Sequence, residues 1–374
     1  MKVLVAAAGS GGHINPGIAI ANKIKEEQPD AEIIFVGTKR GLENDLVPRS
    51  GFELEKIEVY GVSREISYTN FKKMCKTLKG FFQARKLVKR IKPDIVIGTG
   101  GYICGPIFLA ANKYKIPTLL HESNAFPGVT VKMLSKKVKT ILVAFKDAKE
   151  RLPKGKNVIL TGTPTKIKDL KLSQDEIDDL KKNQGFVTNK PLVLVYGGSQ
   201  GAKSINESII EIIELSKNKE YEIMWATGPK QYEIIRKELE DKKIDINNIN
   251  GVKILPYIYN MDEAMNISDL CVCRSGAMTI TEMSIIGKPA IFAPFPFAAE
   301  NHQEYNAKVL VNQGAARILT DKNMTGNTLN DLINEMIKDR NKLKQMGENA
   351  KKIVINNVED KIYDEIRKLM NLKK

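Results

Sequence analysis

Cysteine is scarce in this sequence. Its four cysteines, Cys75, Cys104, Cys271 and Cys273, are too few and too scattered for a disulfide framework. Cys271 and Cys273 are not accompanied by a second pair of cysteines or histidines at zinc-finger spacing. We therefore expect a protein of a reducing compartment without structural zinc.

Long apolar runs are also missing. No window approaches the roughly 18 uninterrupted apolar residues of a membrane span, and the long run at 283–299 contains Lys288 and several prolines. The opening MKVLVAAAG has a short apolar run that leads into glycines, so we expect a buried first strand rather than a secretion signal. The sequence predicts a protein that does not cross a membrane.

Acidic residues are outnumbered. The 44 Asp and Glu face 59 Lys and Arg, and the net charge of +15 favours an anionic partner: nucleic acid, a membrane surface or a phosphorylated substrate. The chain is rich in Lys, Ile and Asn together, so the clustering of the charge is more informative than its sum. The stretch 71–92, FKKMCKTLKGFFQARKLVKRIK, contains no acid at all.

Apolar residues recur at helical spacing within this basic stretch. Basic charge beside an apolar stripe is typical of a helix that lies in an anionic membrane interface. We therefore predict that its first part contacts the membrane and that its last part faces the protein core. The predicted membrane contacts are Phe71, Met74, Leu78, Phe81 and Phe82, and the predicted core residues are Leu87, Val88 and Ile91.

Two domains are expected, because 374 residues exceed the length at which a single core normally splits. Short β-branched runs alternate with amphipathic stretches, which predicts an α/β protein with two doubly wound, Rossmann-like domains. Ligands in such sheets bind beyond the carboxyl ends of the strands, so we expect the site in a cleft between the domains. The predicted strands are 3–7, 32–36, 95–97, 118–120 and 140–143, then one after Pro191, 222–225, 252–255, 270–273 and 290–292.

Four glycine-containing turns follow predicted strands. Glycine after a strand allows close backbone approach, and the helix that follows presents unpaired N–H groups to an anion. Ser275 and Gly276 stand where the helix of the fourth turn would be capped. Four such turns in two matched halves indicate more than one bound phosphate group. They are GSGG at 9–12, GTGGYICGP at 98–106, GGSQGA at 197–202 and CRSGAMTITE at 273–282.

These turns do not match the common nucleotide fingerprints. Ile14 stands where the third glycine of a dinucleotide-binding loop belongs, and the second strand ends in Gly37 and Thr38 without the acidic residue that holds a ribose. A P-loop is excluded because Ile18 and Ala19 occupy the positions of its lysine and hydroxyl residue. Hydride transfer and P-loop NTP hydrolysis are therefore not expected.

The complete set of motifs resembles the MurG family of peptidoglycan glycosyltransferases. GSGGHINPG, GTGGYICGP, HESNAFPG, GGSQGAKSIN, CRSGAMTITE and NHQEYNA occur in the family's order between Val3 and about Ala316. The resemblance implies a GT-B fold: an acceptor- and membrane-binding domain at 1–163, with a C-terminal helix at about 355–374 packing back on it, and a UDP-sugar domain at 164–354. It also implies a peripheral enzyme on the cytoplasmic face of the cell membrane. This enzyme would transfer N-acetylglucosamine, with inversion, from UDP-N-acetylglucosamine to the C4 hydroxyl of undecaprenyl-diphosphate-linked N-acetylmuramoyl pentapeptide.

The resemblance assigns donor contacts mainly to the second half. Glu282 would accept hydrogen bonds from both ribose hydroxyls, which suits a carboxylate because it is acceptor only. Ile258 would meet the uracil through its backbone, and Lys166 stands where some family members have an arginine, whose guanidinium fork lysine cannot reproduce. The other implied donor contacts are Ser10, Gly11, Gly12, Asn124, Ser199, Ala277, Met278, Thr279 and Gln303.

The implied acceptor site lies in the first half. Its diphosphate would sit against Ser10, Gly11, Gly12, Gly100, Gly101 and Tyr102, beside His13. The attacking hydroxyl must lose a proton, and histidine has a suitable unperturbed pKa. His13 is therefore the candidate base; the alternative is a histidine that caps the turn or hydrogen-bonds phosphate. His121, at a strand end, is expected to orient Asn124.

No D-x-D sequence is present, the usual means by which a different glycosyltransferase fold holds a divalent ion on the nucleotide. We therefore expect no metal or other cofactor. Two other functions stay open: a GT-B enzyme with another lipid acceptor, or a UDP-sugar epimerase; and a basic nucleic-acid-binding module. The last lacks a recognisable helix-turn-helix, zinc-finger or aromatic stacking motif, so no nucleic-acid partner is expected.

Overall fold

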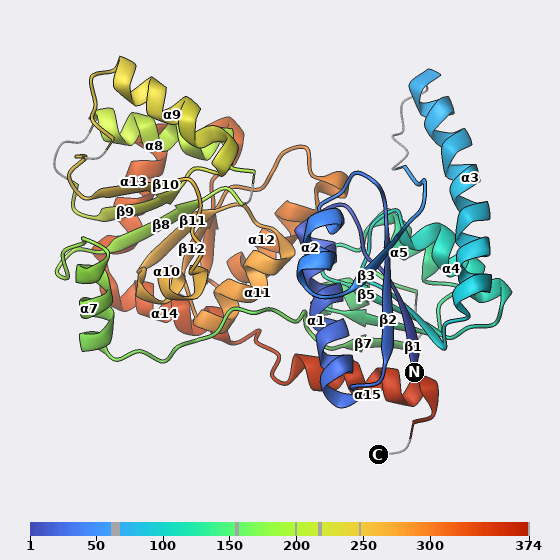
Figure 1. Ribbon diagram of the computed structural model, residues 1–374. Helices are drawn as coiled ribbons and strands as arrows, with labels where there is room; N and C mark the ends of the chain where they lie inside the picture. The colour runs from blue at the N-terminus through green and yellow to red at the C-terminus, as the bar shows by residue number, and fades with distance from the viewer. Residues whose placement is uncertain (61–67, 154–156, 199, 216–218, 247, 373–374) are drawn as a thin grey trace. The chain divides into compact units, whose positions relative to one another are not determined.

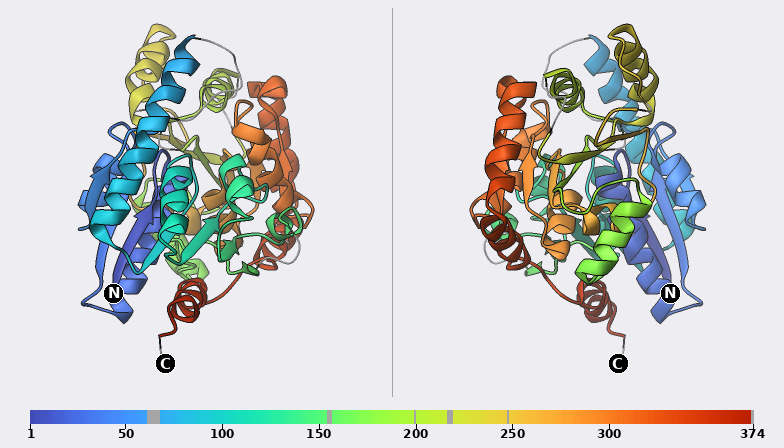
Figure 2. Two further views of the ribbon diagram at one scale, coloured as in Figure 1. Left: turned by 90° about the vertical axis from the view of Figure 1, so that its right-hand side faces the viewer. Right: turned by 90° about the vertical axis from the view of Figure 1, so that its left-hand side faces the viewer.

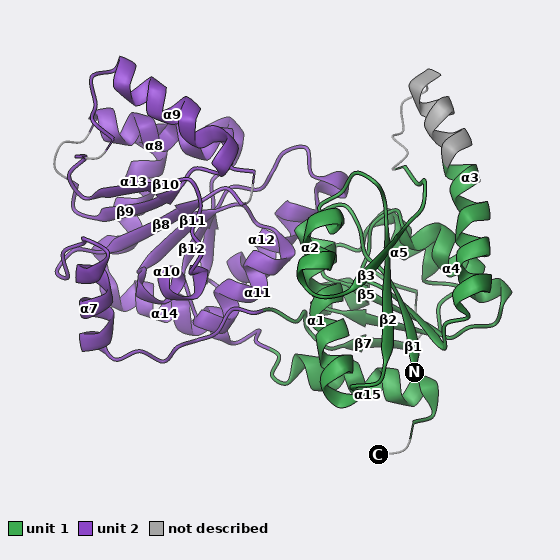
Figure 3. Cartoon of the chain, viewed as in Figure 1, with its two compact units in different colours: residues 1–165, 355–374 green, residues 166–354 purple. Residues whose placement is uncertain are grey.

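The computed structural model describes residues 1–60, 68–153, 157–198, 200–215, 219–246 and 248–372; of residues 68–76 only the backbone is described. The chain divides into two compact units, 1–165 with 355–374, and 166–354 (Figure 3). The first crossover between the units thus comes two residues after position 163, where the sequence analysis places it. Each unit is built on its own parallel sheet (Figure 1).

Unit 1 contains, among the described residues, a seven-stranded sheet in the order β3-β2-β1-β4-β5-β6-β7. The strands are β1 (Lys2–Ala6), β2 (Glu32–Gly37), β3 (Glu53–Lys56), β4 (Ile95–Gly98), β5 (Thr118–Glu122), β6 (Thr140–Val143) and β7 (Asn157–Leu160). The helices are α1 (Gly11–Glu27), α2 (Glu43–Arg49), α3 (Tyr68–Ile91), α4 (Cys104–Lys113), α5 (Val129–Leu134), α6 (Lys146–Glu150) and α15 (Val358–Met370).

Both faces of the unit 1 sheet are buried. Successive residues of β1 point to opposite faces: Leu4 and Ala6 pack with α3, α4 and α5, whereas Val3 and Val5 pack with α1, α2 and α15. A sheet covered on both faces needs apolar side chains throughout its central strands. The central strands therefore read as continuous apolar runs.

The C-terminal helix α15 packs against α1 of unit 1. Ile366 and Tyr363 lie in the same core as the buried face of α1, and Gln28 donates a hydrogen bond to the Tyr363 hydroxyl at 3.1 Å. Lys23 of α1 forms an ion pair with Asp360 at 2.7 Å. The N-terminus and the last turn of α15 lie at the same end of unit 1 (Figure 2).

Unit 2 contains, within its described part, a six-stranded sheet in the order β10-β9-β8-β11-β12-β13. The strands are β8 (Leu192–Tyr196), β9 (Glu222–Ala226), β10 (Val252–Leu255), β11 (Leu270–Cys273), β12 (Ala290–Phe292) and β13 (Ala316–Ile318). The α-helices are α7 (Gln174–Asn183), α8 (Lys203–Leu215), α9 (Pro229–Asp241), α10 (Met261–Ile267), α11 (Ala277–Ile286), α12 (His302–Val311), α13 (Gly326–Lys338) and α14 (Arg340–Lys351). Two short 3-10 helices, η1 (Ala299–Asn301) and η2 (Asp321–Asn323), join them.

Strand order reverses once in each sheet, and the glycine turns lie at these points. In unit 1 the reversal falls between β1 and β4, where Ala6 pairs with Gly98; in unit 2 it falls between β8 and β11, where Tyr196 pairs with Cys273. Adjacent connections depart in opposite directions there and leave a crevice at the carboxyl ends of the strands. The sheet topology therefore brings the four glycine turns together in pairs, one pair in each unit, and confirms the predicted α/β class.

Three strands were not predicted: β3, β7 and β13. All three are edge strands, paired on one side only. The sequence of β3, ELEK, carries three charges, and β13 has only three residues. An edge strand can expose one side and stay short, so its apolar signal is weak: β7, NVIL, has three apolar residues in a row, but none of them is buried.

Candidate functional site

The first glycine loop, residues 9–12, joins β1 to α1. Gly9 has φ of +96°, and Ser10 is the exposed N-cap residue of the helix. The first backbone bonds of the turn run from the His13 and Ile14 amides to Ser10 O, at 3.0 and 3.1 Å. The amides of Gly11 and Gly12 precede these bonds, at the end of a helix where anions bind.

The His13 ring packs directly on the second glycine turn of unit 1. A methyl group at Gly100 would lie 2.8 Å from His13 Cδ2, and one at Gly101 would lie 3.4 Å from Nδ1. Both glycines have positive φ, +102° and +80°, a conformation that strains any other residue, and at Gly100 a side chain would also clash with the His13 ring. The buried Thr99 donates a hydrogen bond to His13 O at 2.6 Å.

The predicted acceptor residues therefore form one cluster in unit 1. Ser10 Oγ lies 3.5 Å from His13 Nδ1, which sets the hydroxyl beside the ring. The Tyr102 ring borders Gly9, since a methyl group there would lie 4.0 Å from Tyr102 Cε1. This cluster combines the amides at the start of α1, a hydroxyl and an imidazole at the carboxyl ends of β1 and β4. It can hold an anion and place a proton acceptor beside it.

Glu43, at the start of α2, was missed by the sequence analysis. Its side chain is fully buried beneath the first glycine loop. Oε2 accepts a hydrogen bond from Gly9 N at 3.0 Å, and Oε1 accepts from the Thr38 amide and hydroxyl, both at 2.8 Å. An acidic residue therefore does lie near the end of β2, but it faces the first glycine loop, and both of its oxygens accept hydrogen bonds from the protein.

The loop after β5 corrects one prediction: Glu122, rather than His121, orients Asn124. The Asn124 amide and its Nδ2 donate to Glu122 Oε1 at 2.9 and 3.0 Å, and Gly128 N donates to Oε2 at 2.8 Å. Burial raises the pKa of Glu122, which these hydrogen bonds partly offset. A carboxylate fits this loop because it faces three N–H donors.

His121 is instead a buried structural residue. Its Nε2–H donates to Gly162 O at 2.9 Å, and the Ser123 hydroxyl lies 3.4 Å from its Nδ1. Burial lowers its pKa to about 4, so the ring stays neutral at physiological pH. Both nitrogens are engaged, which leaves His13 as the candidate base of unit 1.

In unit 2 the loop after β8 is packed tightly against the loop after β9. A methyl group at Gly201 would lie 2.2 Å from Thr227 O, and one at Gly228 would lie 2.6 Å from Gly201 N. Both glycines have positive φ. Glycine is required here because two backbones meet. Ser199, an implied phosphate contact in this loop, lies outside the described residues.

Helix α11 begins at the second switch-point turn. Gly276 is its N-cap residue, and the first helical bond runs from Ile280 N to Gly276 O at 3.1 Å. The predicted phosphate contacts Ala277, Met278 and Thr279 thus supply amides that precede this bond. Ser275 does not cap the helix, contrary to prediction: its hydroxyl donates to Gln303 O at 2.8 Å.

Glu282 lies one turn further along α11, on the face that carries Met278 and Thr279. It is half-buried. Burial raises the pKa of Tyr196 well above its ordinary value, and the nearby Cys273 thiol and Glu282 carboxylate add to this. Since Tyr196 ends β8, the carboxylate lies close to the switch point of unit 2.

Gln303 and Arg274 fix the loops around α11. Gln303 Oε1 accepts from Phe295 N at 2.9 Å, which ties α12 to the loop after β12. The Arg274 guanidinium forms a two-pronged ion pair with Asp321 and donates to Ser204 Oγ at 3.1 Å. Arg274 stands within the motif CRSGAMTITE, whose sequence alone predicts no role for it. Only the fold brings residues 204 and 321 beside it.

The remaining predicted donor contacts differ in their surroundings. Ile258 is buried and lines a pocket of about 240 Å³ beside the exposed Tyr257 and Tyr259, whose rings lie 5.0 Å apart edge to face. Lys166 is exposed at the first position of unit 2. Ser10, Gly11, Gly12 and Asn124 belong to unit 1, whereas the other donor contacts belong to unit 2.

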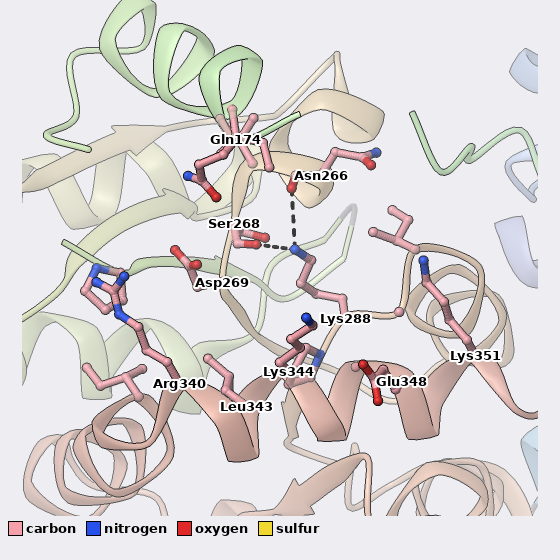
Figure 4. A pocket seen from close by; sticks show the side chains of 18 of the residues that line it. Gln174, Asn266, Ser268, Asp269, Lys288, Arg340, Leu343, Lys344, Glu348 and Lys351 are labelled. Atoms are coloured by element: carbon pink, nitrogen blue, oxygen red, sulfur yellow. Dashed lines mark hydrogen bonds between the residues drawn. The ribbon is translucent and has the colours of Figure 1, made fainter. Parts of the chain in front are cut away.

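A pocket of about 580 Å³ lies at the amino ends of strands in the unit 2 sheet (Figure 4). The segments that precede β8, β11 and β12 line it, together with α14. Lys288 points into it and donates to Asn266 O at 3.5 Å and to Ser268 O, and Lys181 pairs with Asp269 at 2.8 Å. Its described lining includes no predicted donor contact. This pocket is therefore separate from the glycine turns, which follow the carboxyl ends of the strands.

Helix α3 contains the predicted membrane contacts. Leu78 and Phe82 are 55% and 69% exposed, whereas Phe81 is half-buried. The side chains of Phe71 and Met74 lie outside the described residues. Leu87, Val88 and Ile91 are buried, as predicted. Among the helices of the described residues, none has both the length and the apolar character that spanning a membrane requires.

Comparison with known proteins places the chain in a family. Residues 3–143 match the glycosyltransferase family 28 N-terminal domain, and residues 192–362 match the corresponding C-terminal domain. The UDP-N-acetylglucosamine–N-acetylmuramyl-(pentapeptide) pyrophosphoryl-undecaprenol N-acetylglucosamine transferase of Acetivibrio thermocellus is 44% identical, covering 100% of this chain and 99% of the relative. The protein of the same name from Clostridioides difficile is 43% identical, covering 99% and 90%.

A solved structure agrees with these relatives. The crystal structure of Acinetobacter baumannii MurG is 30% identical with a TM-score of 0.75, and the match covers 98% of this chain and 99% of that one. The GT-B fold implied by the motifs is confirmed by this match and by the two parallel sheets. The chain belongs to the MurG family of N-acetylglucosamine transferases, within glycosyltransferase family 28.

Proposed function

We propose that the protein transfers N-acetylglucosamine from UDP-N-acetylglucosamine to undecaprenyl-diphosphate-linked N-acetylmuramoyl pentapeptide, converting lipid I to lipid II. The full-length match to transferases of this name carries the proposal. The geometry supports it, because each sheet presents a glycine turn and a helix N-terminus at its switch point. Two such sites suit a reaction in which both substrates carry a diphosphate.

The unit 2 site is suited to the donor. The amides of Ala277, Met278 and Thr279 would bind the UDP diphosphate at the positive end of α11, and Glu282 would accept both ribose hydroxyls. Negative charge builds on this diphosphate as the glycosidic bond breaks. Donors fixed in advance stabilise that charge without reorganisation in the transition state.

The unit 1 site is suited to the acceptor. The amides of Gly11 and Gly12 would hold its diphosphate, and His13 would take the proton of the C4 hydroxyl. The hydroxyl oxygen forms a bond to the anomeric carbon from the side opposite UDP. The bond to the UDP oxygen breaks in the same displacement, UDP leaves with that electron pair, and the configuration inverts.

We expect this transfer to proceed without a metal ion, because α11 offers its dipole and amides where other folds place a cation. The test is release of UDP from UDP-N-acetylglucosamine and a lipid I analogue, measured with and without EDTA. We expect UDP release with the lipid I analogue and none with diacylglycerol. We also expect the rate with the lipid I analogue to be the same with and without EDTA. Conversion of UDP-N-acetylglucosamine to another UDP-sugar without acceptor, with no net release of UDP, would support an epimerase instead. Loss in EDTA restored by magnesium would contradict metal independence.

We also propose that α3 docks the protein on the cytoplasmic face of the cell membrane. Leu78 and Phe82 stand one turn apart and project outward, and Lys79, Arg85 and Lys86 beside them are exposed. An exposed apolar pair framed by cations fits an anionic lipid surface, and anionic lipid is a simpler partner for this charge than nucleic acid. The acceptor's lipid tail stays in the bilayer, so docking brings the enzyme to its substrate.

Changing Leu78 and Phe82 together to serine is expected to weaken binding to anionic vesicles by about tenfold or more, since each removed apolar side chain contributes about 1.5–3 kcal/mol when buried. Vesicle pelleting measures this. The matched control changes Leu215 and Ile234 of unit 2, which are 60% and 67% exposed, to serine. Equal pelleting of the two double variants would count against docking through α3.

A further inference from the structure

We propose that Glu43 is a positioning residue that presets the first glycine loop, residues 9–12, for the acceptor diphosphate. The inference rests on the proposed function, because it takes that loop as the acceptor site. Glu43 itself is buried beneath the loop and does not face a ligand.

The contacts of Glu43 join the ends of two strands. Oε1 is held by the amide and hydroxyl of Thr38, which follows β2, and Oε2 is held by Gly9 N, which follows β1. All three bonds lie between 2.8 and 3.0 Å. A fully buried carboxylate needs each of these donors, since losing one leaves charge uncompensated. The loop is therefore locked to β2 through one side chain.

The neighbouring sequence is shaped around this carboxylate. A methyl group at Gly41 would lie 1.8 Å from Glu43 Oε2, and one at Gly37 would lie 2.6 Å from Glu43 Cγ. Any larger residue at either position would displace the carboxylate from its donors. Two glycines thus clear a space for Glu43 directly beneath the loop.

This arrangement decides which loop amides can meet an anion. Glu43 turns the Gly9 amide inward, which leaves the amides at the start of α1, those of Gly11 and Gly12, for the ligand. His13 follows at once and is fixed from the other side by Thr99. Releasing Gly9 would therefore shift both the phosphate-binding amides and the imidazole, whereas the donor site in unit 2 would keep its structure.

The test uses Glu43→Gln in the full-length protein. Glutamine has the same size as glutamate, but one of the two carboxylate oxygens is replaced by an NH₂ group. That group cannot accept the hydrogen bond that Gly9 N or Thr38 N donates. We expect kcat/KM for a lipid I analogue to fall about 10- to 100-fold, the scale of a small misplacement of reacting groups. Calorimetric affinity for UDP is expected to stay the same. Amide hydrogen exchange in residues 9–13 is expected to accelerate.

Asp45→Asn is the matched control, because Asp45 lies on the same helix with its side chain 56% exposed and paired only to Arg49 in the described contacts. It is expected to leave both kinetics and exchange unchanged. If the native protein transfers nothing to the lipid I analogue, the proposed function fails, yet faster exchange in Glu43→Gln still supports the positioning role. Unchanged exchange and kcat/KM in Glu43→Gln would overturn the inference, and so would loss of UDP binding.

Discussion

Replacing His13 by alanine is expected to lower kcat by about 10²- to 10⁴-fold, the range that a positioned general base contributes. His13 packs on Gly100 and Gly101, and its backbone carbonyl accepts a hydrogen bond from Thr99. The ring is therefore held at the carboxyl ends of β1 and β4. His121, the other histidine of unit 1, is buried and has both ring nitrogens engaged. No substitute for His13 is therefore expected from His121.

The dependence of kcat on pH distinguishes the two roles proposed for His13, a general base and a residue that only binds phosphate. If it takes the proton, kcat falls at low pH in the native enzyme with an apparent pKa in the histidine range, and this limb disappears in His13→Ala. If it only binds phosphate, the acceptor KM rises while the pH profile of kcat keeps its shape. UDP affinity, which we propose is set by unit 2, serves as the folding control. Near-normal turnover in His13→Ala would exclude the role of base.

Replacing Glu282 by glutamine is expected to weaken UDP binding about 10- to 100-fold, because hydrogen bonds to a charged group contribute about 1.5–3 kcal/mol. Glu282 shares a face of α11 with Met278 and Thr279, whose amides begin the helix. A carboxylate accepts from both hydroxyls of a ribose, whereas an amide presents a donor to one of them. Calorimetric titration with UDP measures the change.

Two measurements make this prediction specific. UDP and 2′-deoxy-UDP should differ in affinity with the native protein and much less with Glu282→Gln, because the variant has already lost one acceptor. Glu233→Gln is the control, since Glu233 is exposed on α9 and pairs with Arg236. A variant of Glu282 that binds UDP as tightly as the native protein would remove this residue from the donor site.

Every central strand of the two described sheets could be predicted from the sequence, whereas most of the edge strands could not. Runs such as LVLVY at 192–196 are buried on both faces and carry apolar side chains at every position. The edge strand β3 has no such run, because its neighbours cover it on one side only. The pattern of apolar residues in a sequence reflects which residues are buried, so a strand that is half exposed is hard to predict from it.

The candidate site was predictable where it depends on backbone, and not where it depends on side chains from distant segments. The glycine turns and helix starts are local features, written in consecutive residues. Glu43 meets Gly9 from 34 positions away, and Arg274 meets Asp321 from 47. No local spacing relates such pairs. The contact of Asn124 was missed for a different reason: His121 and Glu122 are both close to it in sequence, and only the structure shows that Glu122 accepts its hydrogen bonds.

The sequence by itself determined the two alternating halves, the glycine turns and the family, because each is recorded in short contiguous motifs. Only the tertiary structure decided which side chains support those turns. It placed Glu43 beneath the first loop, His121 on Gly162 and Ser275 on Gln303. The physical reason is that a buried polar group must find its partners in space, and those partners come from whichever strand ends the sheet order brings together.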